Sequence, residues 1–410
     1  MTPDLIMVFV ASAALLSYWF SHISGRLRLP SVVLLVVTGV IARIVTHLQH
    51  SSVAMPPQVL PVLGTAGLVL IVLEGALDLH VEYSQRRFVL RTLINAVVGL
   101  VVTTAFLSLA IHFVLSVTWL DATLVATPFS IISSAVAIPS AQLLGSSDRS
   151  FVVYESSWSD ILGVMLFNAI LVAVHGGGVT FNVLAGGIGV ALGGAIVATA
   201  FYWLVGHMQG HVKFAPLLFA IMLVYAGADA ARLSPLLMVL IVGLALNNAQ
   251  IFRRVRAFGR LHSPGYEEEL VRLKHVTAEA SFVTRTFFFL ALGYNTDPRV
   301  FADLQVWLFA LVAVMLVFGA RVVALSVCNG RRIRPLVWLA PRGLITATLY
   351  LGLPRSLFEG KIPPGTLVMV VLLSCIVMVL GMRFGSAREE DKFERSIDVP
   401  TTEAGAAVRE

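Results

Sequence analysis

Charged side chains are scarce in this 410-residue chain, because Asp, Glu, Lys and Arg together make up only 13% of it. A soluble globular domain has roughly 25% charged residues. Hydrophobic residues reach 58%, and the mean hydropathy is +0.88. This composition excludes an ordinary soluble domain. It predicts an all-α polytopic membrane protein, since many apolar runs are long enough to span a bilayer as helices.

Cysteine is also scarce, with only Cys328 and Cys375 in or beside predicted spans. Two such residues indicate neither a disulfide framework nor a metal site. The first apolar run, 5–20, has no basic segment before it and no small-residue cleavage site, which favours a retained helix over a signal peptide. The net charge of +6 lies in short loops, so it indicates membrane orientation and no nucleic-acid partner.

The apolar runs predict thirteen membrane spans. Their approximate bounds are 4–22, 30–48, 59–78, 89–115, 119–144, 151–174, 181–206, 212–229, 233–248, 275–294, 303–328, 335–354 and 363–383. The spans form one transmembrane domain, 1–385. The polar segment 386–410 is expected to be a short, disordered cytoplasmic tail.

Basic residues alternate between loops. Of the 29 lysines and arginines, 21 fall in loops on one side of the membrane and four on the other. The positive-inside rule then puts the C-terminus in the cytoplasm. With an odd number of spans, the N-terminus lies outside. We expect a multi-pass protein of the plasma (inner) membrane.

Two carboxylates, Glu155 and Asp160, lie in the span 151–174. Ionisable groups at this depth are costly and usually mark an ion path or a proton relay. Five residues correspond to about 140° around a helix, so the two groups meet different neighbours. Arg321, inside the span 303–328, needs a partner, and Glu155 is the best candidate. Their pairing would leave Asp160 as the titrating group.

Two spans are expected to be interrupted. The span 119–144 contains Pro128 and Pro139 with four hydroxyl residues between or beside them, and 335–354 contains Pro341, Arg342 and Gly343. Broken helices at membrane depth survive where the freed backbone lines a cavity. They are the fifth and twelfth spans, seven positions apart, and an odd offset places them in opposite orientations. This favours inverted repeats with two interrupted helices crossing at the midplane. A simple proline kink, with hydroxyls bonded to their own helix, is the alternative for the first.

Glu74 lies near the cytoplasmic end of the span 59–78. A carboxylate there either reaches toward the membrane centre as an ion ligand or extends to the interface.

Together these residues resemble those of the monovalent cation:proton antiporters of the sodium/proton exchanger type. Four short motifs occur in the family's order: 73–77 (LEGAL), 155–160 (ESSWSD), 320–322 (ARV) and 341–344 (PRGL). The resemblance covers about 5–385. It implies the sodium/proton antiporter fold, a homodimer, and a core domain that moves like an elevator against a dimerisation domain.

The resemblance also implies the site. Asp160 would carry the monovalent cation or the proton, and Glu155 would pair with Arg321. The remaining ion-site positions are Glu74, Ser133, Ser134, Ser156 and Ser159. No cofactor is implied beyond the transported Na⁺ or K⁺ and H⁺.

Two departures from the family pattern bear on the mechanism. Ser159 replaces the family's Asn or Asp, and a single aspartate goes with electroneutral exchange. Ser133 and Ser134 stand where the family has a Thr-Asp pair. A Ser-Ser pair at this place is similar to that of potassium-efflux relatives. The transported cation is therefore left open among Na⁺, K⁺ and Li⁺.

The predicted function is therefore secondary active antiport of a monovalent cation, Na⁺ first, against H⁺, with competition at Asp160. An ion-coupled solute symporter on the same scaffold is the alternative. An intramembrane hydrolase would show paired aspartates in two spans or a His-Glu-x-x-His helix, and the sequence has neither. An enzyme is therefore not expected. A sensor or channel-like protein that has lost transport is a third class.

Overall fold

The computed structural model describes the chain in fourteen stretches. These are 11–20, 22–23, 29–48, 58–78, 86–141, 144–174, 193–194, 196–197, 199–200, 214–230, 235–247, 266–329, 336–354 and 360–397. Within them the regular structure is helical and contains no strand. Seven of these helices are long and apolar enough to cross a membrane, and three shorter apolar helices accompany them. The predicted all-helical membrane fold is confirmed. The count of thirteen stays a prediction, because the expected span 181–206 falls mostly outside the described residues.

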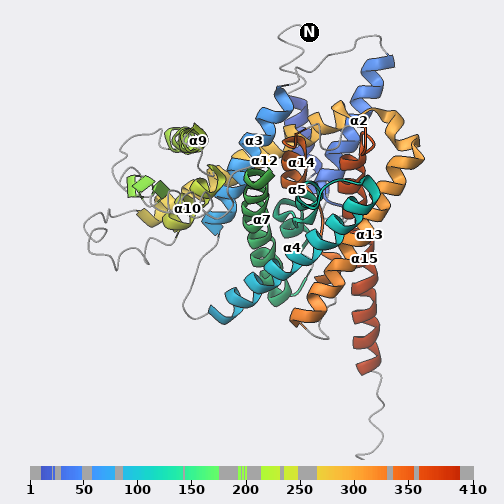
Figure 1. Ribbon diagram of the computed structural model, residues 1–410. Helices are drawn as coiled ribbons and strands as arrows, with labels where there is room; N and C mark the ends of the chain where they lie inside the picture. Colours follow the sequence, from blue (N-terminus) through green and yellow to red (C-terminus); the bar gives the residue numbers. More distant parts are fainter. Residues whose placement is uncertain are drawn as a thin grey trace, which may run out of the picture.

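The helices of the first half are α2 (Ser31–Leu48), α3 (Val59–Asp78), α4 (Arg86–Leu115), α5 (Trp119–Ser130), α6 (Ser134–Ser140) and α7 (Ser146–Val174). Those of the second half are α9 (Phe214–Ala230), α10 (Pro235–Asn247), α12 (Tyr266–Asn295), η4 (Pro298–Ala302), α13 (Leu304–Asn329), η5 (Leu336–Trp338), α14 (Leu344–Leu351) and α15 (Thr366–Ile397). Figure 1 shows α5, α7 and α14 in the middle of the bundle, with α9 and α10 to one side and α13 and α15 to the other.

Two helices begin earlier than expected. α7 starts at Ser146 and α12 at Tyr266, several residues before the apolar runs. Their first turns carry Asp148 and Glu267–Glu269 respectively. Acidic residues are favourable there because the backbone N–H groups at a helix N-terminus carry partial positive charge. Hydropathy alone locates the apolar part of such a helix and not its polar first turns.

The segment expected to be a disordered tail begins as helix. α15 continues through Ser386 to Ile397, and residues 398–410 lie outside the described part of the chain. Residues 387–395 are mostly Ala, Arg, Glu and Lys, which have high helix propensity. A helix already nucleated in the membrane extends into such a sequence without a new nucleation step.

Small residues let two of the helices approach closely. A Cβ on Gly39 of α2 would meet the backbone oxygen of Leu290 on α12, and one on Gly293 would meet the backbone oxygen of Val36. Close backbone approach at glycines is the usual means of packing helices in membranes. α12 also packs along α3, so α2, α3 and α12 form one block.

Two membrane spans are interrupted, as the sequence predicts. α5 ends at Ser130 and α6 begins at Ser134, with extended backbone between them. In the second, η5 is followed by non-helical residues 339–343 before α14 begins. The two non-helical segments meet where the Ser133 N–H donates to the Pro341 carbonyl at 3.0 Å. The predicted crossing of two interrupted helices is therefore present.

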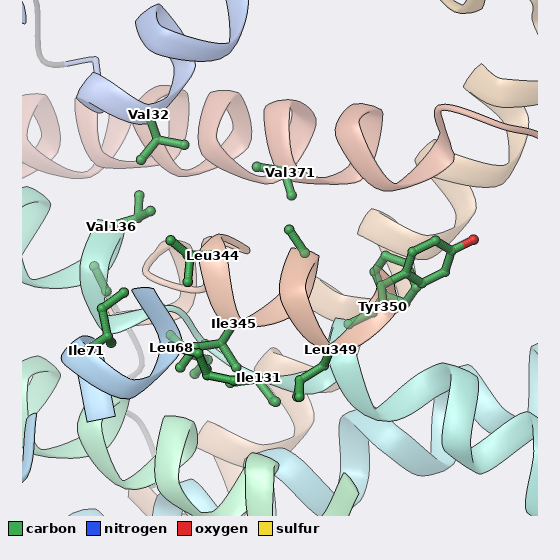
Figure 2. Close-up of a cluster of buried hydrophobic side chains, with 14 of the residues drawn as sticks. Val32, Leu68, Ile71, Ile131, Val136, Leu344, Ile345, Leu349, Tyr350 and Val371 are labelled. Carbon is green, nitrogen blue, oxygen red and sulfur yellow. The ribbon is translucent and has the colours of Figure 1, made fainter. Parts of the chain in front are cut away.

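Apolar side chains surround this crossing. Figure 2 shows Ile131 and Val136 from the first interrupted span with Leu344 and Ile345 from the second. Leu68 of α3 joins the same buried cluster. The crossing thus lies inside a packed apolar core, where each polar group needs a specific partner.

Candidate functional site

Three hydrogen bonds hold the backbone of the first interruption. The N–H of Ile132 donates to Ser159 Oγ at 3.0 Å, and the N–H of Ser134 donates to Asp160 Oδ2 at 3.2 Å. The intervening N–H, of Ser133, donates to Pro341. Alternate amides of an extended segment point in opposite directions. The extended segment between α5 and α6 is therefore bonded to α7 on one side and to the second interrupted span on the other.

Asp160 is buried at this junction, with 4% of its surface exposed. Oδ2 accepts from Ser134, whose hydroxyl also interacts with the carboxylate. Oδ1 is fully buried and has no hydrogen-bond partner within the described residues. A buried carboxylate oxygen without a donor is costly unless a cation or a proton occupies it. This oxygen is therefore the candidate position for a bound cation or proton.

The serines near Asp160 differ in their bonding. Ser156 lies one helical turn before Asp160 on α7, and its hydroxyl donates back to the Val153 carbonyl at 3.3 Å. The Ser133 carbonyl accepts from the first amides of α6, so it serves that helix. The Ser133 side chain lies against Gly343, where a Cβ would collide with its hydroxyl. The sequence-predicted serines are thus gathered at the crossing, and their proposed role as ligands stays a prediction.

Glu155 faces away from Asp160, toward Arg321 of α13. Arg321 donates from Nη1 to Oε1 and from Nη2 to Oε2, the second at 2.7 Å. Both residues are almost fully buried. The guanidinium also donates from Nε and Nη2 to the Leu336 carbonyl, at 3.3 and 3.2 Å. The ion pair expected from the sequence is present, and it ties α7 and α13 to the start of the second interrupted span.

Arg342 lies at the crossing itself. Its Nη1 donates to the Ile131 carbonyl at 2.7 Å, and its backbone N–H donates to Ser374 Oγ on α15 at 2.9 Å. The guanidinium thereby satisfies the Ile131 carbonyl at the end of α5, since a carbonyl at a helix C-terminus has no donor within its own helix. Of the prolines, Pro341 lies in the non-helical segment before α14, whereas Pro128 and Pro139 lie inside α5 and α6 on either side of the first break.

Glu74 lies on α3, half-buried and one turn before the end of the helix. It takes no part in the hydrogen bonds given above for Asp160. Its assignment as an ion ligand stays a prediction.

Two buried residues of the site were missed by sequence reasoning. Asn95 of α4 donates from Nδ2 to Glu155 Oε1 at 2.7 Å, and Ser374 holds the backbone of Arg342. Asn95 is the one amide in the apolar run 88–102, and an isolated amide there was a usable signal. Ser374 had no such signal, because serine is common in membrane helices.

Comparison with known proteins assigns the family. The family model described as "Sodium/hydrogen exchanger, transmembrane" matches residues 10–384. The chain belongs to this family. The sodium/hydrogen exchangers are membrane transporters, and the resemblance drawn from the four motifs is confirmed. A search of curated proteins finds no match to this exchanger.

Solved structures agree with the fold. The exchanger is similar to the sodium proton antiporter MjNhaP1 from Methanocaldococcus jannaschii at pH 8, with 20% identity and a TM-score of 0.69. The match covers 92% of this chain and all of that one, at 100%. A second MjNhaP1 structure, from an electron-microscopy map, gives 19% identity, a TM-score of 0.67 and coverage of 95% and 98%. At this identity the likeness concerns the fold.

Proposed function

We propose that this exchanger is a secondary active antiporter that exchanges one monovalent cation for one H⁺ at Asp160. Na⁺ is the first candidate, with K⁺ and Li⁺ as alternatives. The observation that carries the proposal is the Asp160 carboxylate, which has one oxygen held by Ser134 and the other buried without a partner among the described residues. Membership of the sodium/hydrogen exchanger family supports it.

Charge balance supports electroneutral exchange. A proton on Oδ1 or an alkali cation against it each adds one positive charge to the same carboxylate. Glu155 is already neutralised by Arg321, so it is not free to add a second exchangeable charge. Because the two loaded forms carry the same charge, a cycle that moves one in each direction moves no net charge across the membrane.

The ligands and the movement follow from the same site. Ser156, Ser159, Ser133, Ser134 and Glu74 are proposed to complete the ion site around Asp160. The core that contains the crossing is proposed to move as an elevator against a dimerisation domain, in a homodimer. The N-terminus would lie outside and the C-terminus in the cytoplasm of a plasma-membrane protein, consistent with the distribution of basic residues.

The decisive experiment measures proton flux in proteoliposomes with a pH-sensitive dye on addition of Na⁺, K⁺ or Li⁺. We expect at least one cation to trigger proton movement and Asp160→Asn to abolish it. The amide keeps the shape of the side chain but has no negative charge with which to bind the cation or the proton. Asp148→Asn is the matched control, since Asp148 lies in the first turn of the same helix, far from the crossing.

Each outcome is informative. Exchange that survives Asp160→Asn contradicts competition at this residue. A folded wild type that responds to no alkali cation contradicts antiport and favours the solute symporter. Solute-dependent uptake measured in the same vesicles would then identify the coupled substrate.

A further inference from the structure

Asn95 sits where the ion pair of Glu155 and Arg321 meets α4. Its side chain is 1% exposed, and its Nδ2 donates to Glu155 Oε1 at 2.7 Å. Oε1 therefore receives two donors, one from Asn95 and one from Arg321, while Oε2 receives one from Arg321. Three helices, α4, α7 and α13, converge on this single carboxylate.

We infer that Asn95 is a positioning residue that holds the Glu155 carboxylate in its pair with Arg321, so that Asp160 alone binds and releases an ion. The inference rests on the proposed function and extends it. A proton or a cation binds most favourably at a buried carboxylate oxygen that no donor already satisfies. Asn95 and Arg321 donate to the two oxygens of Glu155, whereas Asp160, one and a half turns along the same helix, has one oxygen without a donor among the described residues.

The chemistry of residue 95 matters because an amide donates without adding charge. A carboxylate at the same position would face Glu155 across a hydrogen-bond distance, and two carboxylates that close share one proton. Asn95 contacts the charged Glu155 of α7, which also pairs with Arg321 of α13, and exposed Arg91 lies one turn earlier on α4. One guanidinium balances one carboxylate, so a second carboxylate would have to hold a proton for the cluster to form.

The test combines stability and transport. Thermal unfolding of the purified full chain is measured for Asn95→Leu, Glu155→Gln and the double variant. We expect the double variant to lose clearly less than the sum of the two single losses, since residues that share one interaction are not additive. Ser108→Ala is the control, because Ser108 is buried on α4 with no partner among the described residues. Its effect should add to that of Glu155→Gln.

The transport arm uses Asn95→Asp in proteoliposomes. We expect near wild-type exchange at acid pH, where the new carboxyl shares a proton with Glu155, and a loss of about tenfold or more as pH rises and that proton leaves. The wild type should not show this added alkaline loss. A residue that only fills space would lower the rate equally at all pH values.

Two results would overturn the inference: additive stability effects of Asn95→Leu and Glu155→Gln, or an Asn95→Asp profile parallel to wild type. Failure of the proposed function looks different. A wild type that exchanges no cation rejects antiport, while the stability cycle, repeated with Asn95→Asp at acid and alkaline pH, still tests whether Asn95 fixes Glu155.

Discussion

At the scale of single residues, two carboxylates on one helix have opposite fates. Glu155 and Asp160 are about 140° apart around α7. Glu155 accepts from the Arg321 guanidinium and the Asn95 side-chain amide, whereas Asp160 accepts from the backbone N–H of Ser134. Burial is nearly the same for both. The number of donors is therefore the basis on which we propose Glu155 as a structural charge and Asp160 as the exchanging one.

Ser159 is the residue at which charge stoichiometry can be changed. Its hydroxyl accepts from the Ile132 N–H, and an Asp at this position keeps an acceptor while adding a second carboxylate beside Asp160. We expect Ser159→Asp to make exchange depend on membrane potential, because two carboxylates can carry two protons against one cation. The measurement is flux in proteoliposomes under an imposed potential, with Ser159→Asn as the uncharged control. Active but potential-independent Ser159→Asp would contradict the one-carboxylate account.

The same hydrogen bond predicts a stability effect. Ser159→Ala leaves the buried Ile132 N–H without an acceptor, which typically costs about 1–3 kcal/mol. Chemical or thermal unfolding in detergent checks this value. Ser157→Ala is the matched control, because the Ser157 hydroxyl only donates back to Val153 on its own helix. Equal losses in the two variants would mean that the bond from Ile132 adds nothing to stability.

At the scale of elements, the crossing depends on the absence of a side chain at Gly343. A Cβ there would collide with the Ser133 hydroxyl and lie 2.8 Å from its Cβ. We expect Gly343→Ala to push the two non-helical segments apart, at a cost of about 1–3 kcal/mol for overpacking, and to reduce exchange strongly. Thermal unfolding and proton flux measured on the same preparation check both effects.

Gly319 of α13 supplies the control for this prediction. A Cβ on Gly319 meets nothing within 4 Å, and the residue lies inside a helix. Gly319→Ala should therefore be neutral or stabilise by up to about 1 kcal/mol through helix propensity. If Gly343→Ala behaved like Gly319→Ala, close contact at the crossing would not matter for transport.

At the scale of the whole molecule, the distribution of basic residues predicts orientation. A phosphatase that is active only outside the cytoplasm, fused after Thr118, should be active, because the connection between α4 and α5 is expected outside. The same reporter after Glu410 should be inactive, and a fluorescent protein there should fold. The reverse pattern would contradict the predicted orientation of the termini.

The sequence alone determined the class of the protein, its two interrupted spans and the ion pair of Glu155 and Arg321. Hydropathy fixes spans because bilayer thickness sets their length, and a guanidinium in hydrocarbon needs a partner, for which Glu155 is the best candidate. These inferences need no knowledge of neighbours. The family motifs then gave the fold, which the comparisons confirmed.

Only the tertiary structure decided where the span 119–144 breaks and which groups hold the broken segment. It also decided which oxygen of Asp160 has no donor among the described residues. Pro128 and Pro139 suggest a break, yet the helix ends at Ser130, between them, because Ser159, Asp160 and Pro341 accept the freed amides there. The isolated amide of Asn95 marks a buried polar residue but not its partner, and Ser374 has no local signal at all. Their partners lie 60 and 32 residues away, and hydrogen bonds between distant segments follow from packing that sequence spacing does not encode.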